Sequence, residues 1–202
     1  MQCVVVFVVC LVGLVAAQDT CVPPTGPHVH HGDCCNLSAL AVFAPMFMSK
    51  TCWQKYPMPP RPTVIPTTPD PAFVRQEICY GECVFSENAL LGSDMKLNVA
   101  AVRAKFVSTD ATLGPVLSAA ITKCLATPAS TDPAIECKSG AGEFLKCVKR
   151  DLFANCPTSL WTSSTECEAL KTKTANCPTL PVKLWHSGRG RGGGGGRRNL
   201  TG

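Results

Sequence analysis

Residues 70–85, with the sequence DPAFVRQEICYGECVF, decide the architecture of this chain. Asp70 followed by Pro71 predicts a helix start, because an aspartate side chain caps free backbone N–H groups and proline suits the first helical position. Cys79 and Cys83 are separated by three residues, so both side chains project from one face of the predicted helix. One helix can therefore be bridged to two other segments at once, which is an efficient way to fix a small helical protein.

The cysteines also indicate the compartment. Residues 1–17 are apolar and uncharged, with small residues Val15 and Ala17 just before Gln18, which predicts a secretory signal peptide. The run is too short for a membrane span, which needs about 20 apolar residues. Of the 14 cysteines, 12 remain after cleavage, and an even number in an exported chain predicts a full set of disulfides. Zinc binding is disfavoured because no two cysteines have just two residues between them, the Cys-x2-Cys spacing that zinc knuckles require.

Apolar residues at helical spacing predict an all-α, disulfide-stapled bundle, and no convincing alternating pattern predicts a strand. The first expected helices span residues 37–48, kinked by Pro45, and residues 70 to about 91, ending before Gly92. Two amphipathic helices should follow: one begins at Ser93 and Asp94, with Met95, Val99, Val102 and Phe106 on one face, and one is capped by Thr112, with Leu113, Val116, Leu117, Ala120, Ile121 and Cys124 buried. The last two expected helices span residues 140–155 and a segment capped by Ser163 or Ser164.

The helical domain is expected to span residues 18–185. It begins with an irregular arm, residues 18–36, and seven prolines in residues 57–71 predict an extended connection. Residues 186–202 are rich in glycine and arginine and are predicted to be disordered. Four arginines of this tail account for most of the net charge of +5, and the nearly neutral remainder argues against nucleic-acid binding. No later segment is apolar and long enough to predict a membrane span.

The order of the cysteines carries more information than their number. Cys52 is followed by 26 residues, Cys79, three residues, Cys83, 40 residues and Cys124, and Cys147 is followed by eight residues and Cys156. This spacing resembles the six cysteines of insect odorant-binding proteins. Additional residues are similar to the signature and flanking cysteines of the Plus-C class of that family: Cys21, Cys34, Cys35, Cys137, Pro157, Cys167 and Cys177.

The resemblance implies three core bridges, Cys52–Cys83, Cys79–Cys147 and Cys124–Cys156. The remaining six cysteines are expected to pair in an order that the sequence leaves open. A bond between the neighbours Cys34 and Cys35 is disfavoured by disulfide geometry. Bridges from the amino-terminal arm to the carboxy-terminal extension are the natural expectation.

The resemblance also implies a function: a secreted carrier that encloses small hydrophobic molecules, such as odorants or pheromones, in an apolar cavity. A homodimer and a chemosensory receptor are further partners that it suggests. Apolar side chains are the usual lining of such cavities, although each of them can equally belong to an ordinary core. The candidates are Phe43, Met46, Phe47, Ile78, Phe85, Leu91, Met95, Val102, Phe106, Val116, Leu117, Ile121, Phe144, Val148 and Leu152. The alternative is a cysteine-rich extracellular interaction protein with a filled core.

Catalysis and metal binding are disfavoured. The cluster His28, His30, His31 and Asp33 lies in the Pro- and Gly-rich arm, where an exposed loop is expected rather than a metal site. No histidine lies in the predicted helical core to activate a nucleophile, so no enzyme activity is expected and no cofactor is implied. The absence of a core histidine also argues against a switch between pH 5 and 8.

Overall fold

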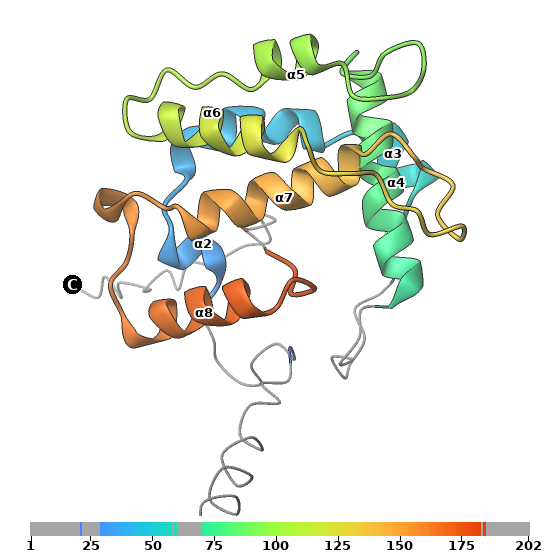
Figure 1. Ribbon diagram of the computed structural model, residues 1–202. Helices are drawn as coiled ribbons and strands as arrows, with labels where there is room; N and C mark the ends of the chain where they lie inside the picture. Colours follow the sequence, from blue (N-terminus) through green and yellow to red (C-terminus); the bar gives the residue numbers. More distant parts are fainter. Residues whose placement is uncertain (1–20, 22–28, 58, 60–69, 183, 185–202) are drawn as a thin grey trace, which may run out of the picture.

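The computed structural model describes residues 21, 29–57, 59, 70–182 and 184, and within them the chain is helical (Figure 1). Two isolated β-bridges occur in this part of the chain, but no strand. The expected all-α, disulfide-stapled fold is therefore confirmed. The elements are α2 (His31–Cys34), the 3₁₀ helix η1 (Ser38–Phe47), α3 (Lys50–Lys55), α4 (Pro71–Glu87), α5 (Val99–Lys105), α6 (Leu113–Cys124), α7 (Ala141–Ala154), η2 (Thr158–Leu160) and α8 (Thr165–Asn176).

Two predicted regions, the signal peptide at 1–17 and the Gly/Arg-rich tail at 186–202, lie outside the described residues, as does most of the proline-rich connection. Among the described helices, none combines the length and apolar character needed to cross a bilayer.

Helix α7 is the centre of the fold. It packs against α4 and α6, while α8 lies on its other side and contacts the short α2 (Figure 1). Phe144, Val148 and Leu152 repeat every four residues along α7 and are buried, so one apolar face of this helix enters the core. A side chain is excluded where α7 meets α4, because a Cβ atom on Gly142 would lie 2.6 Å from the Cα atom of Ile78.

The predicted helix starts at Asp70 and Ser164 are confirmed. The Asp70 carboxylate accepts a hydrogen bond from the amide of Ala72 at 2.9 Å, and the Ser164 hydroxyl accepts one from the amide of Cys167 at 3.2 Å. These side chains satisfy amide groups that have no partner within the first turn of a helix.

The predicted end of α4 near Leu91 is wrong, because the helix ends at Glu87. The Asn88 side-chain amide donates a hydrogen bond to the Val84 carbonyl at 2.8 Å. Ala89 then takes a left-handed backbone conformation with φ of 54°, which ends the helix before Gly92.

The helix predicted to begin at Ser93 and Asp94 is also shorter than expected. The Gly92 amide donates to the Lys96 carbonyl at 2.8 Å and closes a turn between the bridged residues Leu91 and Leu97. Helix α5 starts only at Val99, after the Asn98 side chain caps the Ala101 amide at 3.1 Å. The hydrogen bonds of this turn therefore outweigh the helical spacing of the apolar residues, and the segment before Val99 is not helical.

All twelve cysteines of the expected domain are paired. The bridge Cys52–Cys83 agrees with the expectation, and the amino-terminal arm is indeed bridged to the carboxy-terminal part of the chain. The expected bridges Cys79–Cys147 and Cys124–Cys156 are wrong. The pairs are Cys21–Cys177, Cys34–Cys167, Cys35–Cys156, Cys52–Cys83, Cys79–Cys137 and Cys124–Cys147.

The expectation took Cys147 and Cys156 as the fifth and sixth core cysteines, whereas Cys137 and Cys147 bond to Cys79 and Cys124. The loop between α6 and α7 runs beside α4, so Cys137 in this loop reaches Cys79 (Figure 1). Cys147 lies farther along, on α7, where that helix packs against α6, and it bonds to Cys124 at the end of α6. Cys156 follows α7 and is left to bond to Cys35.

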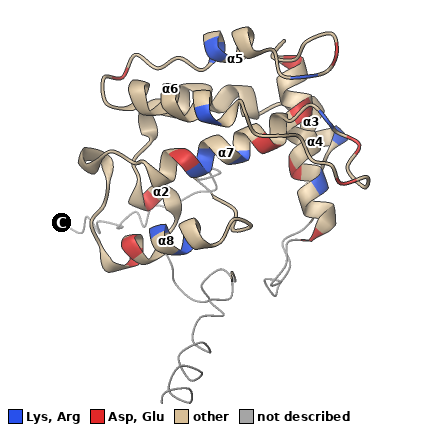
Figure 2. Cartoon of the chain, in the orientation of Figure 1, with Lys and Arg blue, Asp and Glu red and all other residues tan. Residues whose placement is uncertain are grey.

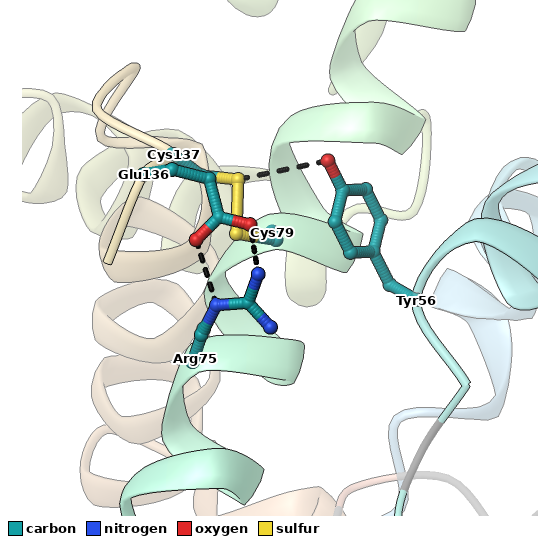
Figure 3. A network of polar contacts seen from close by, with 5 residues as sticks. All are labelled: Tyr56, Arg75, Cys79, Glu136 and Cys137. Carbon is teal, nitrogen blue, oxygen red and sulfur yellow. Dashed lines mark hydrogen bonds and ion pairs between the residues drawn. A yellow bond between two sulfur atoms is a disulfide. The ribbon is translucent and has the colours of Figure 1, made fainter. Parts of the chain in front are cut away.

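An ion pair supports the Cys79–Cys137 bridge (Figure 3). Arg75 on α4 donates from Nε to Glu136 Oε2 at 2.7 Å and also forms a hydrogen bond to the second carboxylate oxygen. The Tyr56 hydroxyl lies 3.8 Å from Cys137 Sγ on the other side of the disulfide. The loop is thus held to α4 by a covalent bond and by a two-point polar contact.

We expect this ion pair to make stability depend on pH. The hydrogen bond from Arg75 lowers the pKa of the Glu136 carboxyl below its ordinary value of 4.5. A lowered pKa in the folded state means that the contribution is present above the ordinary value and is lost as the pH falls through the lowered one. In chemical denaturation, Glu136→Gln should be less stable than the parent at neutral pH and equally stable in strong acid. A difference that stays constant with pH would contradict this role.

The expectation of an exposed histidine loop is wrong for His31. Its side chain is buried, its Nε2 lies 3.1 Å from the Thr174 hydroxyl oxygen, and its ring packs edge-on against Phe153 at 4.6 Å between centroids. The neighbouring Cys34–Cys167 bridge draws α2 onto α8, so this part of the arm becomes core.

Arg150 fixes the carboxy-terminal extension to α7. Its guanidinium donates hydrogen bonds to the carbonyls of Leu180 at 2.9 Å, Cys177 at 3.1 Å and Thr174. Burial lowers the pKa of this guanidinium, but arginine remains charged in proteins. Three carbonyl groups at the end of α8 and beyond it therefore share one cation.

Candidate ligand-binding site

A small apolar pocket lies between η1, the end of α5, α6 and α7. Its volume is about 30 Å³. The lining residues are Leu40, Phe43 and Phe47 from η1, Phe106 after α5, Leu117 from α6, and Leu145, Val148, Lys149 and Leu152 from α7. Lys149 is the one charged residue of this lining. The pocket has room for about one water molecule, which an apolar wall would not hold well.

Phe106 occupies the centre of an aromatic cluster beside this pocket. Its ring centroid lies 5.3 Å from that of Phe43, 6.0 Å from that of Phe85 and 6.2 Å from that of Phe144. These separations are typical of favourable aromatic pairs. Phe106 follows the last turn of α5, and the hydrogen bond from its amide to the Val102 carbonyl at 3.0 Å fixes its backbone.

A second pocket opens on the surface between α5 and α6. Its volume is about 210 Å³, and it is lined by Arg103, Phe106, Val107, Ser108, Gly114, Ser118 and Ile121. Its lining combines polar and apolar residues, in contrast to the first pocket. The absence of a side chain at Gly114 lets the preceding loop approach α6, since a Cβ atom there would lie 2.7 Å from the Ser108 carbonyl oxygen.

Phe106 lines both pockets and forms part of the wall between them. Neither pocket by itself reaches the roughly 300–1,000 Å³ of typical small-molecule sites. Phe106 is the one lining residue that the two pockets share.

Thirteen of the fifteen predicted lining residues fall into three groups. Six line the apolar pocket: Phe43, Phe47, Phe106, Leu117, Val148 and Leu152. Ile121, together with Phe106, lines the surface pocket. Six others pack in the same core without lining either pocket: Met46, Phe85, Leu91, Val102, Val116 and Phe144.

Two of the predicted residues lie elsewhere. Ile78 packs in a separate cluster with Cys79, Ile135 and Cys137, because it faces the loop that the Cys79–Cys137 bridge holds. Met95 lies in the turn before α5 and is 48% exposed. Both residues follow the helical pattern of the sequence, but neither contributes to the site.

Several lining residues of the two pockets are not among the fifteen candidates. Leu40 belongs to the apolar pattern of residues 37–48, so its periodicity could have identified it. The remaining ones carry no such signal, because they are polar or small or lie between helices: Arg103, Val107, Ser108, Gly114, Ser118 and Lys149, as well as Leu145 on the flank of α7.

The segment η1 covers the apolar pocket and is attached at both ends. The bridges Cys35–Cys156 and Cys52–Cys83 flank it. The Tyr80 hydroxyl donates a hydrogen bond to the Phe47 carbonyl at 2.6 Å, and burial raises the pKa of this hydroxyl, so it stays protonated. The segment itself is a ten-residue 3₁₀ helix, whose hydrogen-bond geometry is poorer than that of an α-helix.

Two groups of side chains in the described part of the chain have metal-ligand spacing, Cys52, Cys83 and Glu87, and Cys79, Glu136 and Cys137. In both groups the sulfur atoms already form a disulfide, so the thiolates that bind metals are not available.

No protein-family model, curated protein or solved structure matches this chain.

Proposed function

We propose that this protein is an extracellular carrier of small apolar molecules, similar to insect odorant-binding proteins of the Plus-C class. The observation that carries the proposal is the pair of pockets that share Phe106, one lined almost entirely by apolar surface and the other by polar and apolar surface in similar amounts. A ligand would enter through the surface pocket, displace the Phe106 ring and place its apolar part between η1, α6 and α7.

The order of the disulfides supports the resemblance. If Cys137 and Cys147 are counted as the fifth and sixth core cysteines, the first bonds to the third, the second to the fifth and the fourth to the sixth. This interlocked order is the one that the resemblance implies. The difference is that Cys137 takes the fifth position instead of Cys147, and Cys147 takes the sixth position instead of Cys156. Six disulfides are also typical of exported proteins, because the export pathway is oxidising.

The proposal is tested by titrating the oxidised protein with an environment-sensitive naphthylamine dye and displacing the dye with small volatile and fatty compounds. We expect saturable binding at one site. Ser118 is exposed and lines the surface pocket, so Ser118→Trp should block entry and weaken dye binding by about tenfold, equivalent to about 1.4 kcal/mol. Ala119→Trp is the matched control, because Ala119 is exposed on the same helix but lines neither pocket.

A different function is favoured by a different observation. Val42, Met48 and Trp53, which are close in the sequence, are 68%, 72% and 46% exposed on or next to η1 and α3. If these side chains act together, they offer apolar area to another macromolecule. With the small volume of the apolar pocket, this favours an extracellular interaction protein with a filled core. Absence of saturable dye binding by the fully oxidised protein would reject the carrier and leave this second function.

A further inference from the structure

We propose that the surface pocket binds the anionic headgroup of an amphiphile, with Arg103 as its principal ligand, while the apolar tail passes Phe106 into the apolar pocket. The inference rests on the carrier function proposed above and names its ligand class: medium-chain molecules that end in a carboxylate. It assigns a role to polar residues that an apolar odorant would leave unused.

Arg103 has hydrogen-bonding capacity to spare. One guanidinium nitrogen donates to the Thr122 hydroxyl at 2.9 Å, whereas an arginine has five N–H donors. Among the residues that the structure describes, no carboxylate forms an ion pair with Arg103. A planar guanidinium binds a carboxylate through two parallel hydrogen bonds, so an anionic headgroup is the partner that best fits the remaining donors.

Two hydroxyl groups line the same pocket. The Ser108 hydroxyl oxygen accepts a hydrogen bond from the Asp110 amide at 3.2 Å, which leaves its own hydrogen available to donate. Ser118 is exposed on α6 and lines the pocket beside Ile121. Both hydroxyls can donate to a carboxylate that Arg103 holds, and neither adds negative charge.

The charge around the pocket also favours an anion. Helices α5 and α6 carry no acidic residue (Figure 2). Of their three basic residues, Lys123 forms an ion pair with Asp151 on α7, whereas Arg103 and Lys105 have no carboxylate partner in the described part of the chain. Asp110 in the loop between α5 and α6 is the nearest acid in the sequence. Its carboxylate already accepts hydrogen bonds from the amides of Thr112 and Leu113 at the start of α6, at 2.9 and 2.8 Å. The partial positive charge at the amino terminus of α6 therefore interacts favourably with this carboxylate.

The floor of the surface pocket then directs the tail. Phe106 and Ile121 are its buried apolar lining residues, and Phe106 borders the apolar pocket on the other side. A headgroup bound at Arg103 therefore places the tail next to the Phe106 ring, which the ligand must displace. An amphiphile with one charged end fits this arrangement, in which polar residues line the entrance, Phe106 follows and the apolar pocket lies beyond.

The test compares decanoic acid with its methyl ester and with decanol as competitors of the naphthylamine dye. Charge-assisted hydrogen bonds are roughly twice as strong as neutral ones, so we expect the parent protein to bind the acid about tenfold more tightly than the ester. Arg103→Gln should bring the affinity for the acid down to that for the ester and leave the ester unchanged. Arg103→Lys should retain part of the preference, which separates loss of charge from misfolding.

Lys50→Gln is the matched control, since it removes one positive charge from an exposed position on α3 that lines neither pocket. An acid preference that persists in Arg103→Gln, or that is lost in Lys50→Gln, would overturn the inference. Equal binding of acid, ester and decanol by the parent protein would also overturn it while leaving the carrier function standing. If none of the three displaces the dye and the dye itself does not bind, the carrier function fails.

Discussion

Phe106→Ala is expected to lower stability and increase ligand binding at the same time. Phe106 is 8% exposed and contacts three other phenylalanine rings, so its truncation should reduce the free energy of unfolding by about 3–5 kcal/mol. The same change removes the ring that lines both the surface pocket and the apolar one. The combined space, enlarged by the volume of the lost ring, should admit benzene-sized and larger apolar molecules, as engineered apolar cavities do.

Two measurements check this expectation. Guanidinium denaturation of the oxidised protein gives the loss of stability, and the dye titration gives the gain in affinity. Ligand added in large excess should restore part of the lost stability, by about 2.7 kcal/mol when its concentration is 100 times the dissociation constant. Stability and affinity that fall together would show that Phe106 supports the site rather than closing it.

Phe153→Ala is the matched control for Phe106→Ala. Phe153 is fully buried, but it packs against His31 and Trp161 near α2 and lines neither pocket. Its truncation should cost a similar amount of stability, about 3–5 kcal/mol, through the same loss of burial and the cavity left behind. Dye binding should remain at the parent level. An equal gain in dye affinity in both variants would mean that any loosening of the core admits the dye.

Gly142→Ala is expected to destabilise the protein, although alanine favours helices. In an exposed helix this substitution would stabilise by about 0.5–1 kcal/mol. Here the new Cβ atom would lie 2.6 Å from the Cα atom of Ile78 and 3.0 Å from its carbonyl oxygen, both of them backbone atoms that cannot rotate away. Helices α4 and α7 would have to separate, at a cost typical of overpacking, about 1–3 kcal/mol.

The measurement is again chemical denaturation, with Ala119→Gly on the exposed face of α6 as the control for the backbone contribution. That reverse substitution should cost about 0.5–1 kcal/mol, since only helix propensity changes. Because the bridges Cys79–Cys137 and Cys52–Cys83 restrain α4, the Gly142→Ala protein should still fold with its disulfides intact. A Gly142→Ala protein as stable as the parent would show that the helices can move apart without cost.

The helices that the sequence predicts well have strong local signals at their ends. Asp70 and Ser164 cap helices through hydrogen bonds to amides two or three residues away, and Pro71 occupies the first position of α4, so no distant part of the chain is needed to define these helix starts. The segment from Ala89 to Asn98 was predicted less well, because a turn and the bridge between Leu91 and Leu97 outweigh its helical apolar pattern.

By itself, the sequence determined the all-α class and the full use of twelve cysteines, and its fifteen candidate lining residues include six of the nine that line the apolar pocket. These features depend on residue type and on periodicity, which are local properties. Only the tertiary structure decided the partners of Cys79 and Cys124, since a disulfide forms between cysteines that the packing of α7 against α4 and α6 brings together. It alone also decided that Arg103, Ser108 and Ser118 share a pocket and that Phe106 separates it from the core, because such a site is assembled from segments whose proximity no local pattern encodes.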